Sequence, residues 1–222
     1  MSQTSPAAVP PGPQAAPDVD NPWAAVTPPS SRRMLLAAID AFAEQGYHAT
    51  TTRDIATRAG LSPAALYMHY PSKSALLAQI SRIGHDAALT LVVSAAGTDD
   101  GAAVPRLRRV VARFVAWHAE HHRVARVVQY ELNALPADDR AAVVSIRRQI
   151  ESVLEQVLRE GVAEQAMAVT QPRRVARAIL SMGIDVARWY DPTGRDSPAD
   201  LGALYADLAE RMVGAAATGG TG

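Results

Sequence analysis

Side chains able to bind phosphate are concentrated near the start of the chain. Residues 31–73 hold five cationic residues against three carboxylates, whereas the 222-residue chain as a whole has 22 basic and 22 acidic residues. The five cations are Arg32, Arg33, Arg53, Arg58 and Lys73, and His48 and His69 lie in the same stretch. A locally basic face can bind DNA phosphates even in a neutral chain, particularly when a dimer presents that face twice.

The elements that would position these side chains are two short helices joined by a tight turn. Thr51 followed by Asp54 is the pattern of a capping box, which starts a helix. Gly60 supplies the left-handed residue that ends this helix, and Ser62 followed by Pro63 starts the next one. Two short helices separated by such a turn form a helix-turn-helix, so the pattern predicts a unit that reads DNA.

A second group that could do chemistry is the cluster of His118, His121 and His122 beside Glu120. His118 and His122 are one helical turn apart, a spacing at which two histidines bind zinc. The spacing places no fourth ligand, so three interpretations stay open: a metal site, a pocket wall carrying His118, and a solvated helix end. We predict no metal and no other cofactor.

No enzyme class is indicated by the rest of the chain. The absence of Cys excludes disulfides, thiolate chemistry and cysteine zinc sites. No Ser-His-Asp order in a strand–turn–helix context, phosphate-binding glycine-rich loop or pair of carboxylates in a predicted cleft can be identified, so we predict no catalytic residues. The alternative of a different class is a helical interaction protein that does not bind DNA.

The composition is that of a helical globular protein. With 48% hydrophobic residues the chain can build one large or two modest domains. No run approaches the roughly 18 apolar residues of a membrane span, and no signal peptide is recognisable, so we expect a cytoplasmic protein without membrane contact. The proline-rich residues 1–29 predict a disordered tail, with Trp23 packed loosely on the first helix.

Apolar residues recur at helical spacing through the remaining chain, without the alternation typical of strands. This pattern predicts an all-α fold. Besides the helix-turn-helix, the expected helices run from Ser30 or Ser31 to Gly46 and over residues 72–96, 104–121, 122–136, 138–161, 172–190 and 197–213.

The segments FAEQGY, TTRDIATRAG and LYMHYPSK resemble the TetR family of bacterial transcriptional regulators. The resemblance implies a nine-helix architecture and a homodimer that binds a palindromic operator on double-stranded DNA. It implies a repressor that leaves DNA when a small molecule enters its second domain. The expected divisions are a helix-turn-helix DNA-binding domain at 30–75, a ligand-binding and dimerisation domain at 76–214, and disordered tails at 1–29 and 215–222.

The resemblance also implies which residues contact DNA. Residues 51–53 match the helix start that approaches phosphates, and residues 62–70 match the recognition helix. Tyr67 and His69 match backbone-binding positions, and Lys73 matches a phosphate-binding lysine at a helix N-terminus, which itself favours an anion. The expected contacts are Thr51, Thr52, Arg53, Ser62, Pro63, Ala64, Ala65, Tyr67, Met68, His69, Tyr70 and Lys73.

The recognition helix departs from the family pattern at Pro63, Ala64 and Ala65, which carry few hydrogen-bond donors. We therefore expect base readout to rely on thymine methyl groups and on Met68.

The segments YELNALP and SMGIDVARWYDPTG resemble actinobacterial TetR regulators of sterol, fatty-acid and acyl-CoA catabolism. This resemblance implies control of lipid or acyl-CoA catabolism by an acyl effector, with or without CoA. The alternative is an efflux regulator that responds to a planar or cationic drug. Expected pocket residues are Trp117, His118, Tyr130 and Asn133, and candidate partners of CoA phosphates are Arg106, Arg109, Arg113, Arg147 and Arg148.

The last two helices are expected to pair with their copies across a two-fold axis. Gly183 and Ala187 would allow close helix approach, and the last helix would contribute apolar area. Two recognition helices would then lie about one DNA turn apart, roughly 34–36 Å. The residues of this expected interface are Gly183, Val186, Ala187, Leu201, Leu204, Leu208 and Met212.

Overall fold

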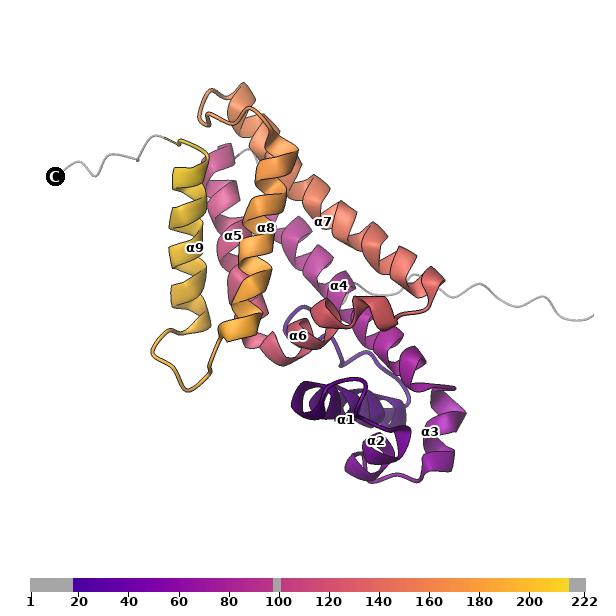
Figure 1. Cartoon of the computed structure of the whole chain (residues 1–222). Helices are drawn as coiled ribbons and strands as arrows, with labels where there is room; N and C mark the ends of the chain where they lie inside the picture. The colour runs from indigo at the N-terminus through magenta and orange to yellow at the C-terminus, as the bar shows by residue number, and fades with distance from the viewer. Residues whose placement is uncertain (1–17, 98–100, 216–222) are drawn as a thin grey trace, which may run out of the picture.

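The computed structural model describes residues 18–97 and 101–215, and in these ranges the protein consists of helices and connecting segments (Figure 1). The all-α, nine-helix architecture predicted from the sequence is confirmed. The helices are α1 (Pro29–Gln45), α2 (Thr52–Arg58), α3 (Pro63–His69), α4 (Lys73–Ala96), α5 (Ala103–Glu120), α6 (His122–Tyr130), α7 (Ala137–Ala163), α8 (Pro172–Trp189), α9 (Pro198–Met212) and a short 3-10 helix, η1 (Leu132–Ala134). None of these described helices is long and apolar enough to cross a membrane.

The helix-turn-helix forms through the local signals that predicted it. Asp54 N donates to Thr51 Oγ1 over 3.1 Å, and Thr51 N donates to Asp54 Oδ2 over 2.9 Å, which completes the capping box of α2. Gly60 takes a φ of +67° after α2, a conformation that is strained for residues with a Cβ. Ser62 Oγ accepts from Ala65 N and starts α3.

The start of α1 differs from the expectation. The helix begins at Pro29, and its N-cap residue Pro28 makes no side-chain cap. Ser30 and Ser31, expected as caps, turn instead toward the end of α3. Ser30 Oγ lies 3.0 Å from His69 Nε2, and Ser31 Oγ lies 2.5 Å from Tyr70 Oη. These two contacts fix α3 to the first turn of α1.

The core of the N-terminal helices continues into the C-terminal part of the chain. Buried residues of α1 to α4 share one apolar cluster with Val124, Val127 and Val128 of α6. At the edge of this cluster, Arg123 Nη2 lies 3.1 Å from Asp40 Oδ1 and 3.0 Å from Glu44 Oε1 of α1. The DNA-binding helices therefore pack on α6 and are not joined to the C-terminal helices through α4 alone.

In the second apolar cluster, α5 lies among α4, α7, α8 and α9 (Figure 1). Helix α9 runs along α5 at very short range: a Cβ at Gly202 would lie 2.5 Å from the carbonyl oxygen of Ala112. Because such a contact does not occur in real structures, only glycine permits this approach of the two helices.

Residues 18–28, which we name the N-terminal arm, pack against both clusters. Trp23 is only 8% exposed and belongs to the apolar cluster of the DNA-binding helices. Val19 packs on the second cluster, around α5. The carbonyl oxygen of Val19 accepts a 3.0 Å hydrogen bond from Trp117 Nε1. The expectation of a disordered tail is wrong for these residues, because Trp23 buries apolar surface that offsets the entropy of ordering. Residues 1–17 and 216–222 lie outside the described chain.

Candidate functional site

The exposed side of α3 presents the residues expected to read DNA. Met68 is 83% exposed and Tyr67 is 53% exposed, while the neighbouring Leu66 is completely buried and anchors the helix. Tyr67 Oη lies 3.0 Å from Thr52 Oγ1, so the outer faces of α2 and α3 are joined at this point. An exposed helix that carries a methionine and a tyrosine on its outer face is available for insertion in a major groove. Thr51, Arg53, Ser62, Pro63 and Ala64 are also exposed, and Thr52 and Ala65 are partly exposed.

Two residues at the end of α3, His69 and Tyr70, contact α1. Tyr70 is buried and its hydroxyl bonds to Ser31, so burial raises the pKa of this phenol. The expected DNA contact of Tyr70 is therefore wrong, because its ring belongs to the core of the helix-turn-helix. His69 is partly buried and contacts Ser30 through Nε2.

Lys73 has a structural task that the sequence did not reveal. Its ammonium group donates to the carbonyl oxygens of Tyr47, His48 and Thr50 over 2.7, 3.3 and 2.8 Å. It also lies 4.5 Å from the centre of the Tyr47 ring. Its three donors are thus directed at the loop between α1 and α2, and the expected phosphate contact would compete with these bonds.

A cavity of about 290 Å³, which we name the central cavity, lies among helices α4 to α8. Its size and its mostly apolar wall are typical of a small-molecule site. The apolar side chains include Phe114, Trp117, Val124, Val128, Ile150 and Leu180.

Polar groups of the central cavity form a short chain across α4, α6 and α7. Arg147 Nε donates to His85 Nε2 over 2.8 Å, and Arg147 Nη2 donates to Gln129 Oε1 over 2.9 Å. Burial and the neighbouring charge of Arg147 lower the pKa of His85 to about 4. Burial also lowers the pKa of His118, whose Nδ1 lies 2.8 Å from the Phe114 carbonyl oxygen, to about 4. Both imidazoles are therefore neutral near pH 7.

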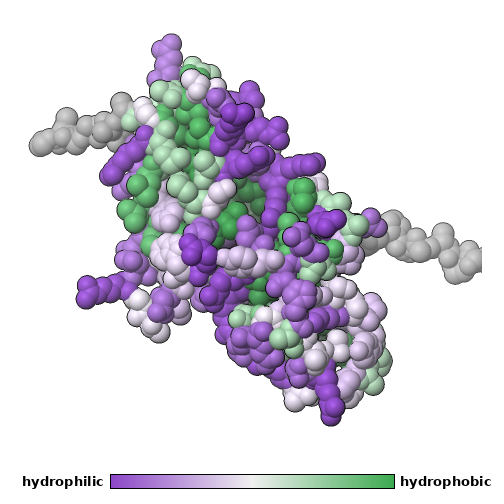
Figure 2. Space-filling model, in the orientation of Figure 1, coloured by the Kyte–Doolittle hydropathy of each residue, from purple (hydrophilic) through white to green (hydrophobic). Residues whose placement is uncertain are grey.

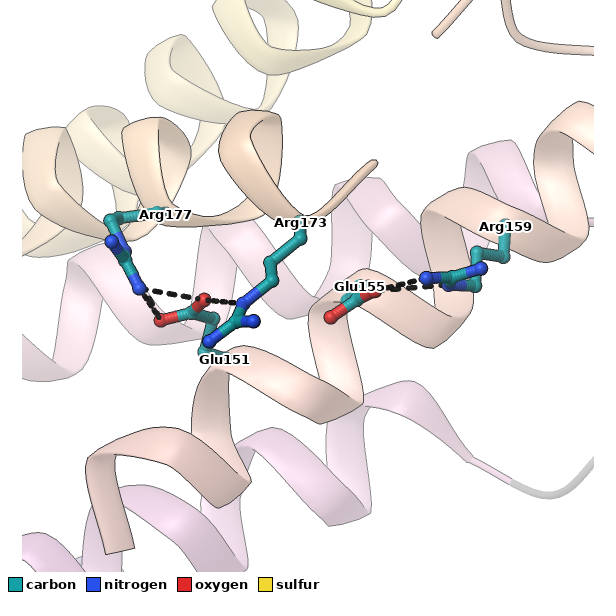
Figure 3. A network of polar contacts seen from close by, with 5 residues as sticks. All are labelled: Glu151, Glu155, Arg159, Arg173 and Arg177. Atoms are coloured by element: carbon teal, nitrogen blue, oxygen red, sulfur yellow. Dashed lines mark hydrogen bonds and ion pairs between the residues drawn. The ribbon is translucent and has the colours of Figure 1, made fainter. Parts of the chain in front are cut away.

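An ionic cluster joins α7 and α8 beside the cavity, whose wall includes Glu151 and Arg177. Figure 3 shows the contacts of this cluster. Arg173 and Arg177 reach from α8 to the carboxylate of Glu151 on α7, with nitrogen–oxygen distances of 3.1 to 3.3 Å. Burial would raise the pKa of Glu151, but these hydrogen bonds and charges hold it below its usual value. Glu155 takes no part, because it pairs with Arg159 on its own helix.

The structure brings together only half of the expected pocket residues. Trp117 and His118 line the central cavity. Tyr130 is 61% exposed and lines a hollow between α6 and α8 that adjoins the central cavity, because Ala125, Gln129, Ser181 and Ile184 line both. Asn133 is exposed on η1 and lines neither of them.

Of the arginines considered for CoA phosphates, only Arg147 lines the central cavity. Arg106 pairs with Glu160, and Arg109 donates to the carbonyl of Ala95. Sequence reasoning missed His85 and Gln129. The available signal for His85 was a Gly84-His85 pair interrupting the apolar stripe of the predicted helix 72–96.

Four of the seven expected interface residues lie inside the chain. Gly183, Val186, Ala187 and Leu201 are buried, and a Cβ at Gly183 would lie 3.0 Å from Phe114 of α5. The close helix contact at Gly183 is therefore made between α8 and α5 of the same chain, not with a second copy. Figure 2 shows apolar side chains gathered over α9 and the adjacent face of α8. The exposed ones include Trp189, Leu204, Leu208 and Met212.

A helix-turn-helix with an exposed second helix, packed on a helical domain that contains a mostly apolar cavity, is the architecture of a DNA-binding regulator with room for a small molecule. The sequence matches the family model for bacterial regulatory proteins of the tetR family over residues 34–80. It matches the model for the tetracyclin repressor-like C-terminal domain over residues 100–213. The chain belongs to the TetR family of bacterial transcriptional regulators, as its motifs predicted.

Individual relatives agree with this assignment. The HTH-type transcriptional repressor KstR2 of Mycolicibacterium smegmatis is 31% identical over 186 residues, 80% of this chain and 88% of the relative. The fatty acid metabolism regulator protein of Bacillus subtilis is 24% identical over 196 residues, 83% and 94% of the two chains. A solved tetR-family regulatory protein from Rhodococcus RHA1 is 40% identical with a TM-score of 0.81, covering 86% of this chain and all of that one. The chain is thus a DNA-binding transcriptional regulator and not an enzyme.

Proposed function

We propose that the chain is a homodimeric repressor that leaves its operator when an acyl compound occupies the central cavity. The observation that carries this proposal is the position of α6, which lines the cavity and also belongs to the core of the DNA-binding helices. A ligand that moves α6 would move α1 with it, since Arg123 bonds to Asp40 and Glu44. The operator lies in the cytoplasm, where we expect the protein to act.

On DNA, each protomer would place α3 in a major groove of a palindromic operator. The proposed contacts are residues 51–53, 62–65 and 67–69, which lie on or next to the outer faces of α2 and α3. Met68 and the small residues at the start of α3 favour thymine methyl groups over hydrogen-bonded base edges. Lys73 and Tyr70 are not among the proposed contacts, because both are engaged within the fold.

The class of effector follows from the cavity wall and from the relatives. The wall is mostly apolar and includes the partly buried cation Arg147, which suits an acyl compound and repels the cationic drugs of the efflux alternative. Relatives that bear the names of a fatty acid metabolism regulator and of KstR2 support a role in lipid or acyl-CoA catabolism.

Release of DNA would be a shift between two populations of the dimer. The effector must bind the form that does not fit DNA more tightly than the DNA-bound form. A difference of about 1–3 kcal/mol corresponds to a 5–150-fold change in operator affinity.

The test begins with selection of the operator from random duplexes, followed by fluorescence anisotropy of the labelled operator. Fatty acids, sterol-derived acids, their CoA thioesters, free CoA and a planar cationic drug are then added in turn. We expect an acyl compound to raise the melting temperature and release the DNA, and free CoA to do neither. Release by the cationic drug with no response to any acyl compound would replace this proposal with the efflux alternative.

A further inference from the structure

Arg147 is a partly buried cation whose partners in the central cavity carry no negative charge. Its hydrogen bonds go to His85 Nε2 and Gln129 Oε1, over 2.8 and 2.9 Å. Across residues 18–97 and 101–215, no carboxylate lies within ion-pair distance of its guanidinium group, and Nη1 makes no hydrogen bond. Burial lowers the pKa of Arg147, so its charged form is partly desolvated and would be stabilised by an anion.

The geometry of His85 shows that this residue is a neutral acceptor. His85 Nδ1 lies 2.7 Å from the Ser81 carbonyl oxygen, which can only accept, so Nδ1 carries the proton. The other nitrogen, Nε2, then accepts from Arg147 Nε. One tautomer satisfies both contacts, and it leaves Arg147 without a counter-charge.

The carboxylate nearest to Arg147 along α7 is already used. Glu151 follows Arg147 by one helical turn and also lines the cavity. Its two oxygens are bound by Arg173 and Arg177 of α8, as Figure 3 shows. This side of the cavity therefore has one carboxylate, Glu151, which is held by two arginines of α8, and a third arginine, Arg147, without an anionic partner among the described residues.

We propose that the central cavity binds its effector as a free carboxylate, with Arg147 as the counter-ion. Guanidinium and carboxylate match in shape, and the free Nη1 and the partly used Nη2 face the same ligand with two donors. The apolar body of the acid packs against Phe114, Ile150 and Leu180. This inference rests on the proposed function and specifies its ligand, since the acyl end of a CoA thioester would present a neutral carbonyl to Arg147 where an acid presents a carboxylate.

The volume sets the size of the acid. At about 30 Å³ for each water-sized group, about 290 Å³ holds roughly ten non-hydrogen atoms. Octanoate and cyclohexylacetate have this size and serve as probes, and their methyl esters have nearly the same shape without the charge.

The test compares acids, methyl esters and octanoyl-CoA by titration calorimetry on the full chain. We expect each acid to bind wild-type protein at least ten-fold more tightly than its ester or the thioester. Arg147→Met should abolish this preference, and Arg147→Lys should keep part of it. The control is Arg148→Met, which removes an exposed arginine of the same helix and should leave the preference intact.

Equal binding of acid and ester to wild-type protein, or no binding of either acid, would overturn the inference without any variant. An acid preference that survives in Arg147→Met would do the same. Operator release is measured separately: acids that bind through Arg147 without releasing DNA would refute the proposed function alone. Release by octanoyl-CoA but not by octanoate would refute the inference alone.

Discussion

Two histidines, the partly buried His85 and the buried His118, make the stability of the C-terminal domain depend on pH. Each has a pKa of about 4 in the folded chain, below the value of about 6.5 expected when unfolded. Between these values the unfolded state binds more protons, so the free energy of unfolding falls as the pH decreases from about 6.5 to 4. Each histidine accounts for a loss on the order of 2 kcal/mol between pH 7 and pH 5.

This prediction is measured by urea unfolding at pH 7 and pH 5 in wild-type protein and in His118→Gln. We expect the variant to lose less stability on acidification than the wild type, by about the contribution of one histidine. His48→Gln is the control, because the His48 side chain is exposed. A variant with an unchanged difference between the two pH values would show that His118 is not held neutral by burial.

Lys73 allows a structural role to be separated from a phosphate contact. Because its ammonium group bonds to three carbonyl oxygens before α2, Lys73→Met should lower the free energy of unfolding by about 1–3 kcal/mol. A phosphate contact alone would instead lower the salt dependence of operator binding by roughly one unit and leave stability unchanged. Arg53→Met removes an exposed cation from α2 and should produce this second pattern. Urea unfolding and salt titration of both variants check the assignment.

At the scale of elements, the helix-turn-helix could be predicted because its signals act within a few residues. Thr51 and Asp54 hydrogen-bond to each other although they are only three positions apart. Gly60 adopts the positive φ that follows α2, and Ser62 caps the first turn of α3. Such short-range hydrogen bonds and backbone preferences depend only on residues a few positions apart, so they can be predicted from the local sequence.

Partners that are far apart in the chain could not be predicted in the same way. Gly183 indicated close helix packing, but nothing local decides between α5 and a second copy of α8. Gly202, which permits the contact of α9 with Ala112, was not singled out at all. Likewise, the burial of Tyr70 could not be predicted, because its hydroxyl contacts Ser31 of α1, which is 39 positions away in the chain.

The N-terminal arm illustrates the same point and carries a prediction. Trp23 contributes a large buried side chain to the core of the DNA-binding helices. Trp23→Ala should therefore lower the free energy of unfolding by about 3–5 kcal/mol, the usual cost of removing a buried aromatic residue. Ala24→Ser changes an exposed neighbour in the same turn and is the control. If urea unfolding gives both variants the stability of the wild type, the arm does not dock as described.

At the scale of the whole molecule, the two apolar clusters are connected at two places. Helix α6 lines the central cavity and completes the N-terminal core, and the arm bonds to Trp117 in the cavity wall while Trp23 enters that same core. The wall of the cavity is therefore built partly from segments that also hold the DNA-binding helices. This arrangement gives a ligand two direct routes to the orientation of α3, without a long chain of intermediates.

The proposed palindromic operator would be bound by two copies of the chain, and we propose that they pair through the exposed apolar residues of α9. Leu204, at 51% exposure, lies on the same face of α9 as the exposed Leu208 and Met212, which are four and eight positions further along the helix. Leu204→Glu should convert the dimer to monomers, because pairing would bury an unpaired charge. Operator affinity should fall at least ten-fold, since the linkage between two half-site contacts is lost. Sedimentation equilibrium and anisotropy measure both effects, with Val93→Glu on the exposed side of α4 as the control. A folded Leu204→Glu variant that stays dimeric would place the interface elsewhere.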